Sequence, residues 1–328
     1  MFRLSCDIKV EGYKAFSPSS AKWRSHVDDY ASTGSFVVPA ICALKTTQSI
    51  EYNLQTGMRF KEGQKVTISA GYDGVKKLRF SGFIARVNYS VPLNVELEGY
   101  SYQLRKKTGI KNSYKNTTVK DLLSDIIKGT DIKLSSKIPE IALSNIQFNG
   151  ASGTDVLNWL KDKCLLTVFF QDNVLYVGLR DTFTISSAKF RINWNVIKAN
   201  DLKFEDKTTA TIQYNIEYRQ KDGKMHKVTV GTNNPLNTVT QKISSIQDDS
   251  LIQKIAKQNL SLKQYAGYEG KIEAFAEPMI ASGETAVIMD KTYPDRTGNY
   301  FVDGVEGEIS RRGGRQTILI GHKLNLTA

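Results

Sequence analysis

The side chains that most often carry out chemistry are few in this sequence and stand apart from one another. The three histidines, His26, His226 and His322, have no cysteine or carboxylate at a spacing that could complete a metal site or a catalytic pair. His226 alternates with valines in a predicted strand, which is typical of a half-buried structural histidine. The histidines therefore predict neither a metal site nor a general base.

Adjacent acids and paired glycines do not predict catalysis either. Asp28-Asp29 and Asp248-Asp249 suit a turn or a helix start, where the positive end of the helix dipole favours a carboxylate. Gly313-Gly314 lies between arginines and strands, whereas a phosphate-binding loop leads from a strand into a helix. We therefore predict no catalytic residue, no metal, no cofactor and no cofactor-binding residue, and we expect a protein that is not an enzyme.

The three cysteines, Cys6, Cys42 and Cys164, are odd in number and far apart. They match neither a disulfide framework nor a metal-ligand spacing, so we predict buried thiols. The longest apolar stretch, residues 36–44, is short and broken by Pro39, whereas a membrane-spanning helix needs about 20 apolar residues. The first seven residues lack the basic-then-apolar plan of a secretion signal, so we expect synthesis and folding in the cytoplasm.

Positive charge is concentrated in one part of the chain. The formal net charge is +12, and residues 101–137 hold nine Lys or Arg against three Asp, a local excess of six. Such a concentration favours binding to nucleic acid or to an acidic protein surface, because summed like charges attract polyanions. A solvated surface is the alternative.

The arrangement of short apolar runs predicts a mainly β protein with an α+β section. The fold class that we expect is two antiparallel β-barrel-like domains plus a small α/β domain, since 328 residues suffice for two or three packed domains. The predicted domains are a first β-barrel at 1–104, a small α/β domain with two helices at 105–182, and a second β-barrel with one helix at 183–328. Each predicted barrel can include segments that are not consecutive in the sequence.

Turn and cap residues predict the individual elements. Hairpins are expected where Gly71-Tyr72-Asp73-Gly74, Gln171-Asp172-Asn173, Lys221-Asp222-Gly223-Lys224 and Arg312-Gly313-Gly314-Arg315 separate β-rich runs. Helices are expected from 119 until Gly129 behind Thr118, from about 154 behind Ser152 or Thr154, and from about 249 to about 264.

Four stretches in family order resemble the late control protein D family of phage tails, whose relatives include the hub part of the VgrG spike proteins. They cover most of the chain. They are 60–66 with Phe80-Ser81-Gly82-Phe83-Ile84, then Gly99-Tyr100-Ser101-Tyr102-Gln103-Leu104, then 118–123 with 153–160 and Tyr176-Val177-Gly178, and finally 282–288 with 298–305.

The resemblance implies a structural baseplate hub of a contractile tail. Such a hub is a homotrimeric ring that joins the sixfold tail tube to the threefold central spike and leaves a channel for DNA. Implied partners are the tail tube protein, a separate central spike protein, the tape measure protein and transiting DNA, with a location in the virion's tail baseplate. Some relatives carry a lysozyme domain or a β-helical spike on the same chain, and the sequence to Ala328 shows neither, so we expect a separate spike.

Within such a ring, part of the basic region becomes a candidate surface. We predict that five cations face the channel or an acidic partner: Arg105, Lys106, Lys107, Lys111 and Lys115.

Two other functions stay open. The barrels and their plentiful aromatic residues also suit a single-stranded nucleic-acid-binding protein, which would bind with strong salt dependence. A cell-wall hydrolase of the injection apparatus would need a carboxylate pair in a cleft.

Overall fold

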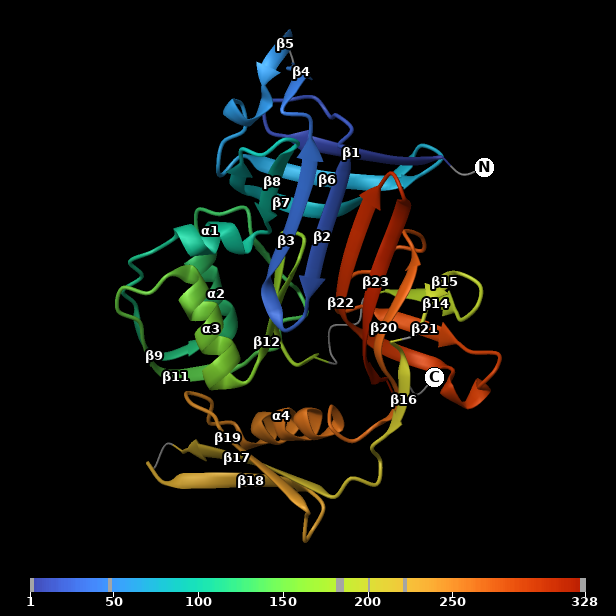
Figure 1. Ribbon diagram of the computed structural model, residues 1–328. Helices are drawn as coiled ribbons and strands as arrows, with labels where there is room; N and C mark the ends of the chain where they lie inside the picture. The colour runs from blue at the N-terminus through green and yellow to red at the C-terminus, as the bar shows by residue number, and fades with distance from the viewer. Residues whose placement is uncertain (1–2, 47–48, 181–185, 200, 221–222, 325–328) are drawn as a thin grey trace.

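The computed structural model describes residues 3–46, 49–180, 186–199, 201–220 and 223–324. Strands outnumber helices in these ranges, and the longest strands belong to one large, mostly antiparallel sheet (Figure 1). The mainly β fold class that the sequence predicted, with a small α+β section, is confirmed.

The first hundred residues form strands that wrap around their own apolar core. Ile8 and Ile68 are paired across neighbouring strands and are both fully buried. The predicted hairpin turns at Asp73-Gly74, where both residues adopt the positive φ that such turns require. The elements are β1 (Leu4–Val10), β2 (Ser20–His26), β3 (Asp29–Val38), β4 (Ile41–Lys45), β5 (Ile50–Gln55), the 3-10 helix η1 (Thr56–Met58), β6 (Lys65–Tyr72), β7 (Val75–Asn88) and β8 (Leu93–Glu98).

The middle section packs short helices against small sheets. Both predicted helices are present, and the predicted hairpin turns at Asp172 with a φ of 51°. A further helix at Ser101–Lys106 was missed, because its six residues follow directly on the strand alternation. The elements are α1 (Ser101–Lys106), β9 (Ser113–Thr118), α2 (Val119–Ile127), β10 (Lys133–Leu134), β11 (Ala142–Gln147), α3 (Gly153–Cys164), β12 (Thr167–Gln171) and β13 (Val174–Gly178).

The last section contains a small three-stranded sheet under one helix and then returns to the large sheet. The predicted helix and hairpin of the small sheet are present, with Lys221 and Asp222 of its turn outside the described residues. The elements are β14 (Ser187–Arg191), β15 (Val196–Lys198), β16 (Lys203–Asp206), β17 (Ile212–Arg219), β18 (Met225–Gly231), β19 (Asn237–Lys242), α4 (Asp249–Ser261), β20 (Ala266–Phe275), β21 (Thr285–Met289), the 3-10 helix η3 (Pro294–Arg296), β22 (Gly298–Ser310) and β23 (Gly313–Lys323).

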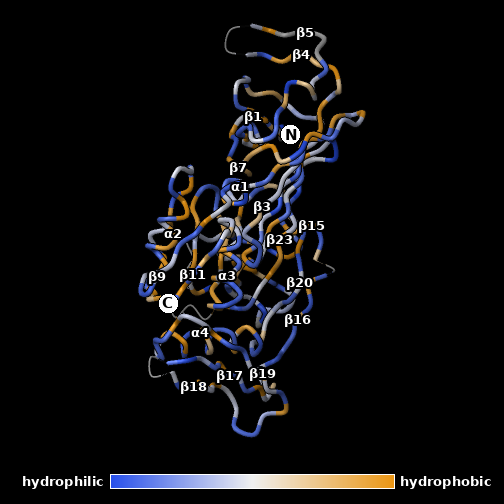
Figure 2. Tube along the Cα trace, turned by 90° about the vertical axis from the view of Figure 1, so that its left-hand side faces the viewer, coloured by the Kyte–Doolittle hydropathy of each residue, from blue (hydrophilic) through white to orange (hydrophobic). Residues whose placement is uncertain are grey.

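The two ends of the chain share the large sheet. Its strand order is β1-β6-β7-β8-β3-β2-β22-β23-β20-β15, with β14, β16 and β21 attached beside this path. Strand β2 pairs antiparallel with β22 from Ala21↔Ile309 to His26↔Gly304, and we call this pairing the seam. The seam lies at the centre of the molecule, with the β4–β5 hairpin at one end and β17–β19 with α4 at the other (Figures 1 and 2).

The buried apolar side chains form three cores. One is enclosed by β1–β8, a second by the C-terminal strands, and the largest joins the middle section to the β17–β19 sheet and α4. The first core also receives Ala276 and Ile309 from the C-terminal part of the chain. The predicted boundary near Leu104 falls inside α1, and the division into three domains stays a prediction.

The N-terminus of α3 offers a test of local helix stability. Ser152 Oγ accepts a hydrogen bond from the Asp155 N–H at 3.1 Å, and the Ser152 N–H donates to Asp155 Oδ2 at 2.8 Å. We expect Ser152→Ala to lower the free energy of unfolding by about 1 kcal/mol, because it leaves the Asp155 N–H without its capping acceptor. Urea denaturation measures the change. Ser124→Ala, on the exposed side of α2, is the control and should be neutral; equal losses in the two variants would contradict the capping role.

Candidate functional site

The outward side of the large sheet at the seam is a polar surface that strands from both ends of the chain build together. On β2, Ala21 and Trp23 point into the core, so Lys22 and Arg24 must point outwards. On β22 the same alternation turns Glu306 outwards. A hollow lies over these strands, and its rim includes Arg312 and Arg315 of the β22–β23 hairpin. The strands therefore present a hydrophilic face that spans both ends of the chain.

Opposite charges face each other across this surface. The ion pairs are Lys22 Nζ with Glu308 Oε2 at 3.7 Å, Arg24 Nε with Glu306 Oε1 at 3.3 Å, and Arg315 Nε with Glu273 Oε1 at 3.7 Å. All six side chains remain well exposed, so solvent screens these pairs and each stabilises the fold by less than about 1 kcal/mol. The three positive and three negative charges of these pairs balance, and Arg312 adds one further positive charge at the rim of the hollow. We call the six paired residues the charged face.

Sequence reasoning missed the charged face, although the alternation of charged and apolar residues along each strand is visible. Lys22 and Arg24 alternate with apolar residues, and so do Glu306 and Glu308 with Gly307 and Ile309. Period-two patterns of this kind predict one polar side for each strand. Nothing local predicts that the two patterns adjoin, because the strands are about 280 residues apart in sequence.

The predicted basic cluster is divided in the structure. Arg105 donates from Nε and Nη2 to Glu98 Oε2 at 3.0 and 2.6 Å, and this hydrogen bond raises the pKa of Arg105. Lys106 pairs with Glu62 at 2.8 Å, which raises the pKa of the lysine and lowers that of the glutamate. Both cations lie in the last turn of α1 and over the Tyr102 ring.

The remaining members of the basic cluster lie beyond α1. Lys107 donates to the Lys128 carbonyl at 2.7 Å. Lys111 and Lys115 are exposed, and Lys115 on β9 borders a groove that Arg219 and Lys242 of the small sheet also line. The structure thus brings Arg105, Lys106 and Lys107 together and places Lys115 on a different surface.

The residues that could carry chemistry have structural surroundings. His26 Nδ1 accepts from the Asp28 N–H at 3.0 Å, and the buried His322 ring stacks on Phe301. Burial raises the pKa of the Cys6 and Cys164 thiols to about 12, which makes them poor nucleophiles. Within the described ranges, no three His, Cys, Asp or Glu side chains gather closely enough to hold a metal ion. The helices described are all too short or too polar to cross a membrane.

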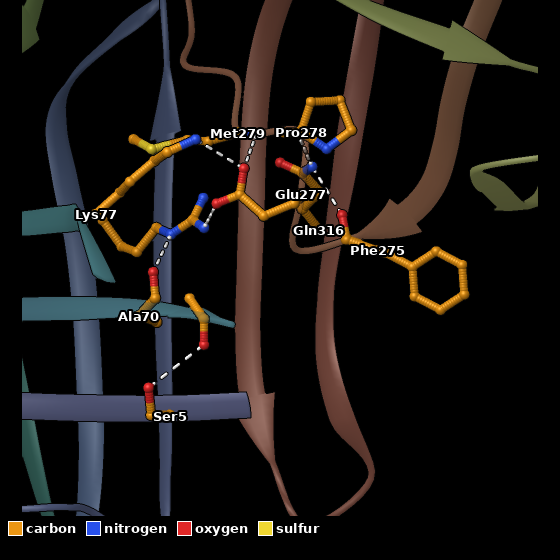
Figure 3. Close-up of polar contacts among 10 residues, drawn as sticks. Ser5, Ala70, Lys77, Phe275, Glu277, Pro278, Met279 and Gln316 are labelled. Atoms are coloured by element: carbon orange, nitrogen blue, oxygen red, sulfur yellow. Dashed lines mark hydrogen bonds and ion pairs between the residues drawn. The ribbon is translucent and has the colours of Figure 1, made fainter. Parts of the chain in front are cut away.

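An ion pair with a buried guanidinium links β7 to the segment that follows β20. Arg79 of β7 donates from Nη2 to Glu277 Oε1 at 2.6 Å and from Nε to the Ala70 carbonyl at 3.2 Å. Lys77 Nζ lies 2.9 Å from the other oxygen of Glu277 (Figure 3). The Gln316 amide bonds to the Phe275 and Pro278 carbonyls, which holds the neighbouring segment in place.

A second group of ion pairs, centred on Arg180, connects several parts of the fold; we call it the Arg180 junction. Arg180, whose side chain is nearly buried, lies 2.9 Å from Asp28 in the β2–β3 turn and pairs with Asp303 of β22. Its guanidinium carbon is 5.2 Å from the centre of the Phe301 ring. The Arg180 N–H donates to Gln258 of α4 at 2.9 Å. Arg180 is therefore the residue at which the middle section, the β2–β3 turn, the seam strand β22 and helix α4 meet.

Comparison with known proteins gives matches only among solved structures, since no family model and no curated protein matches the chain. A tail protein of Neisseria meningitidis MC58 has a TM-score of 0.66 at 14% identity, covering 98% of this chain and 96% of that one. A 43 kDa tail protein of prophage MuSo2 from Shewanella oneidensis has a TM-score of 0.66 at 10% identity, covering 98% of each.

A third similar structure comes from a secretion system. It is an Escherichia coli component of the type VI secretion system, described as structurally similar to the bacteriophage T4 tail proteins gp27 and gp5. Its TM-score is 0.59 at 10% identity, with 97% of this chain and 77% of that one covered. At such identities a likeness establishes the fold alone. Over nearly its whole length, the chain has the fold of phage tail proteins and of their structural counterpart in type VI secretion.

Proposed function

We propose that the chain is a structural baseplate hub of a contractile tail or of a related injection machine, of the late control protein D type. Three copies form a ring that joins a sixfold tail tube to a threefold spike. The observation that carries the proposal is the seam, which merges strands from both ends of the chain into one sheet. Two strand-rich parts per subunit would supply six similar units around a threefold axis.

The charged face is suited to line the channel of such a ring. DNA binds proteins mainly through cations that neutralise its phosphates, so in a channel that lets DNA pass most cations should be paired with carboxylates. On the charged face, Glu273, Glu306 and Glu308 pair with Lys22, Arg24 and Arg315, and Arg312 adds one cation beside them. We assign this face to the channel and the basic cluster at α1 to contact with an acidic partner surface.

The remaining assignments follow from the ring. We propose the tail tube protein and a separate central spike protein as axial partners, with the tape measure protein and DNA in transit through the channel. The location is the tail baseplate of the virion. The role is structural: the charged groups at the seam and at Arg180 pair with one another and connect parts of the fold.

Native mass spectrometry tests the ring directly. The purified chain is expected to appear as a trimer, and negative-stain images should show a threefold ring with a central opening. A chain that remains monomeric at all accessible concentrations would contradict the proposal.

The channel assignment has its own test in DNA binding. We expect the wild-type ring to bind double-stranded DNA weakly, and we expect Glu306→Lys/Glu308→Lys to bind it more tightly with a steeper salt dependence, by about 0.9 in slope per added phosphate contact. Fluorescence titration at several salt concentrations measures both. The control, Glu140→Lys/Asp162→Lys, adds the same charge at exposed positions elsewhere. Equal gains in DNA affinity for the two variants would contradict the channel assignment. Tight binding of single-stranded DNA by the wild type would favour the alternative function, a single-stranded nucleic-acid-binding protein.

A further inference from the structure

One tryptophan side chain is largely exposed to water. Trp194, in the turn between β14 and β15, is 78% exposed, whereas Trp23 is 8% exposed and Trp159 packs edge-on against Phe148. An exposed tryptophan leaves a large apolar area that a protein contact can remove from water, and tryptophan is enriched among the residues that dominate binding energy at interfaces.

The turn holds this tryptophan in a defined place. Asn195 Oδ1 accepts from the Arg191 N–H at 2.7 Å, and Asn195 Nδ2 donates to the Lys189 carbonyl at 2.9 Å. The Trp194 N–H donates to the Arg191 carbonyl at 3.1 Å, and Asn193 takes a positive φ of 65°. Because the backbone is already fixed, a partner that covers the indole orders little additional chain.

The turn also lies at an open border of the large sheet. Strand β15 is the last strand of the sheet order, and β14 pairs with β21 alone among the described strands (Figure 1). Ile197 on β15 adds a second partly exposed apolar side chain. Open sheet borders with apolar side chains are where another polypeptide can add.

Charge indicates what kind of partner fits there. Residues 187–199 contain Lys189, Arg191 and Lys198 and no acid, so the partner should offer apolar groups beside a carboxylate. This chain carries such a surface on the other side of the seam. In the β7–β8 turn, Tyr89 and Val91 are 76% and 90% exposed. Glu96 follows on the exposed side of β8, where it stands opposite Arg86 and accepts from the Asn88 amide at 2.7 Å.

We propose that Trp194 anchors the contact between neighbouring copies of this chain, inserting against the β7–β8 turn of the next subunit. The inference rests on the proposed ring and names the surfaces that close it. The two surfaces lie on opposite sides of the sheet order, separated by β3, β2, β22, β23 and β20, so the contact is heterologous. Heterologous contacts generate a ring when the rotation between neighbours closes, and the proposed threefold ring requires a rotation that does.

Single substitutions test the anchor. Trp194→Ala is expected to weaken self-association about 30-fold or more in sedimentation velocity, which is the effect of losing a central interface tryptophan. Its monomer should unfold in urea like the wild type, since the indole makes little contact within its own subunit. Leu236→Ala, which removes an 88% exposed side chain from the distant β18–β19 turn, is the control and should assemble normally.

A mixing experiment tests the pairing of the two surfaces. Tyr89→Ala is expected to impair assembly like Trp194→Ala. Mixed in equal amounts, the two variants should form a heterodimer, because the intact Trp194 of one meets the intact Tyr89 of the other. Failure of the mixture to associate, or normal assembly of Tyr89→Ala, would overturn the assigned receiving surface.

The outcomes separate this inference from the proposed ring. A wild-type trimer together with an equally stable Trp194→Ala trimer overturns the anchor and leaves the ring intact. A wild type that stays monomeric overturns both. Quenching of indole fluorescence by acrylamide should also decrease on wild-type assembly and not change with concentration in Trp194→Ala.

Discussion

Replacing Glu277 with alanine is expected to lower the free energy of unfolding by about 3 kcal/mol, because it leaves a buried guanidinium without its counter-charge. The Arg79 side chain is only 2% exposed, and the Glu277 side chain is 30% exposed. Burial lowers the pKa of Arg79, and the charge of Glu277 opposes that effect. Urea denaturation at pH 7 measures the loss.

A surface ion pair on the same sheet provides the control for Glu277. Glu273→Ala removes the partner of Arg315, but both of those side chains are more than one-third exposed and their charged atoms are 3.7 Å apart. Its expected cost is below about 1 kcal/mol. Equal costs for the two substitutions would show that Arg79 does not depend on its carboxylate.

The Glu277 effect should also depend on pH in a defined direction. Burial alone would raise the pKa of Glu277, but the hydrogen bond from Lys77 and the charge of Arg79 outweigh burial and hold that pKa below the ordinary value of 4.5. A carboxyl with a lowered pKa stabilises the fold fully above its unfolded pKa and loses this contribution as the pH falls through the folded pKa. The stability gap between wild type and Glu277→Ala should therefore be largest near neutral pH and shrink below about pH 4.5.

Adding a single methyl group at Gly307 is expected to destabilise the seam by about 3 kcal/mol. Gly307 pairs with Trp23 across β2 and β22, and a Cβ atom there would overlap the six-membered ring of that tryptophan. The indole is packed in the first core, so it cannot move away without creating a cavity. Thermal and urea denaturation of Gly307→Ala measure the loss.

The neighbouring strand provides a matched control for Gly307. Gly34 pairs with the same Trp23 from the β3 side, and a Cβ atom there would meet nothing nearer than the Lys22 carbonyl oxygen at 3.2 Å. Gly34→Ala should therefore cost clearly less. In a double-mutant cycle, Trp23→Val should relieve part of the Gly307→Ala cost. Strict additivity would show that the indole is not the obstacle.

Local signals in the sequence predicted much of the secondary structure. Ser152 and Thr118 accept the first hydrogen bonds of α3 and α2, and such caps are read from a few consecutive residues. Asp73-Gly74 and Asp172 form their turns for a similarly local reason, the ease with which glycine and aspartate adopt positive φ. The short helix α1 was missed because its six residues follow directly on the strand alternation, and the sequence does not reveal its contact with α3.

The sequence alone thus determined the β-rich class, most helices and hairpins, and the separation of polar from apolar sides along each strand. Only the tertiary structure decided that β2 lies beside β22, that Arg79 is buried while Lys77 two residues earlier is exposed, and that the basic cluster divides between two surfaces. The physical reason is the range of the interactions. Caps and turns act over a few residues, whereas burial and charge pairing depend on groups up to about 280 residues away that only the folded chain brings together.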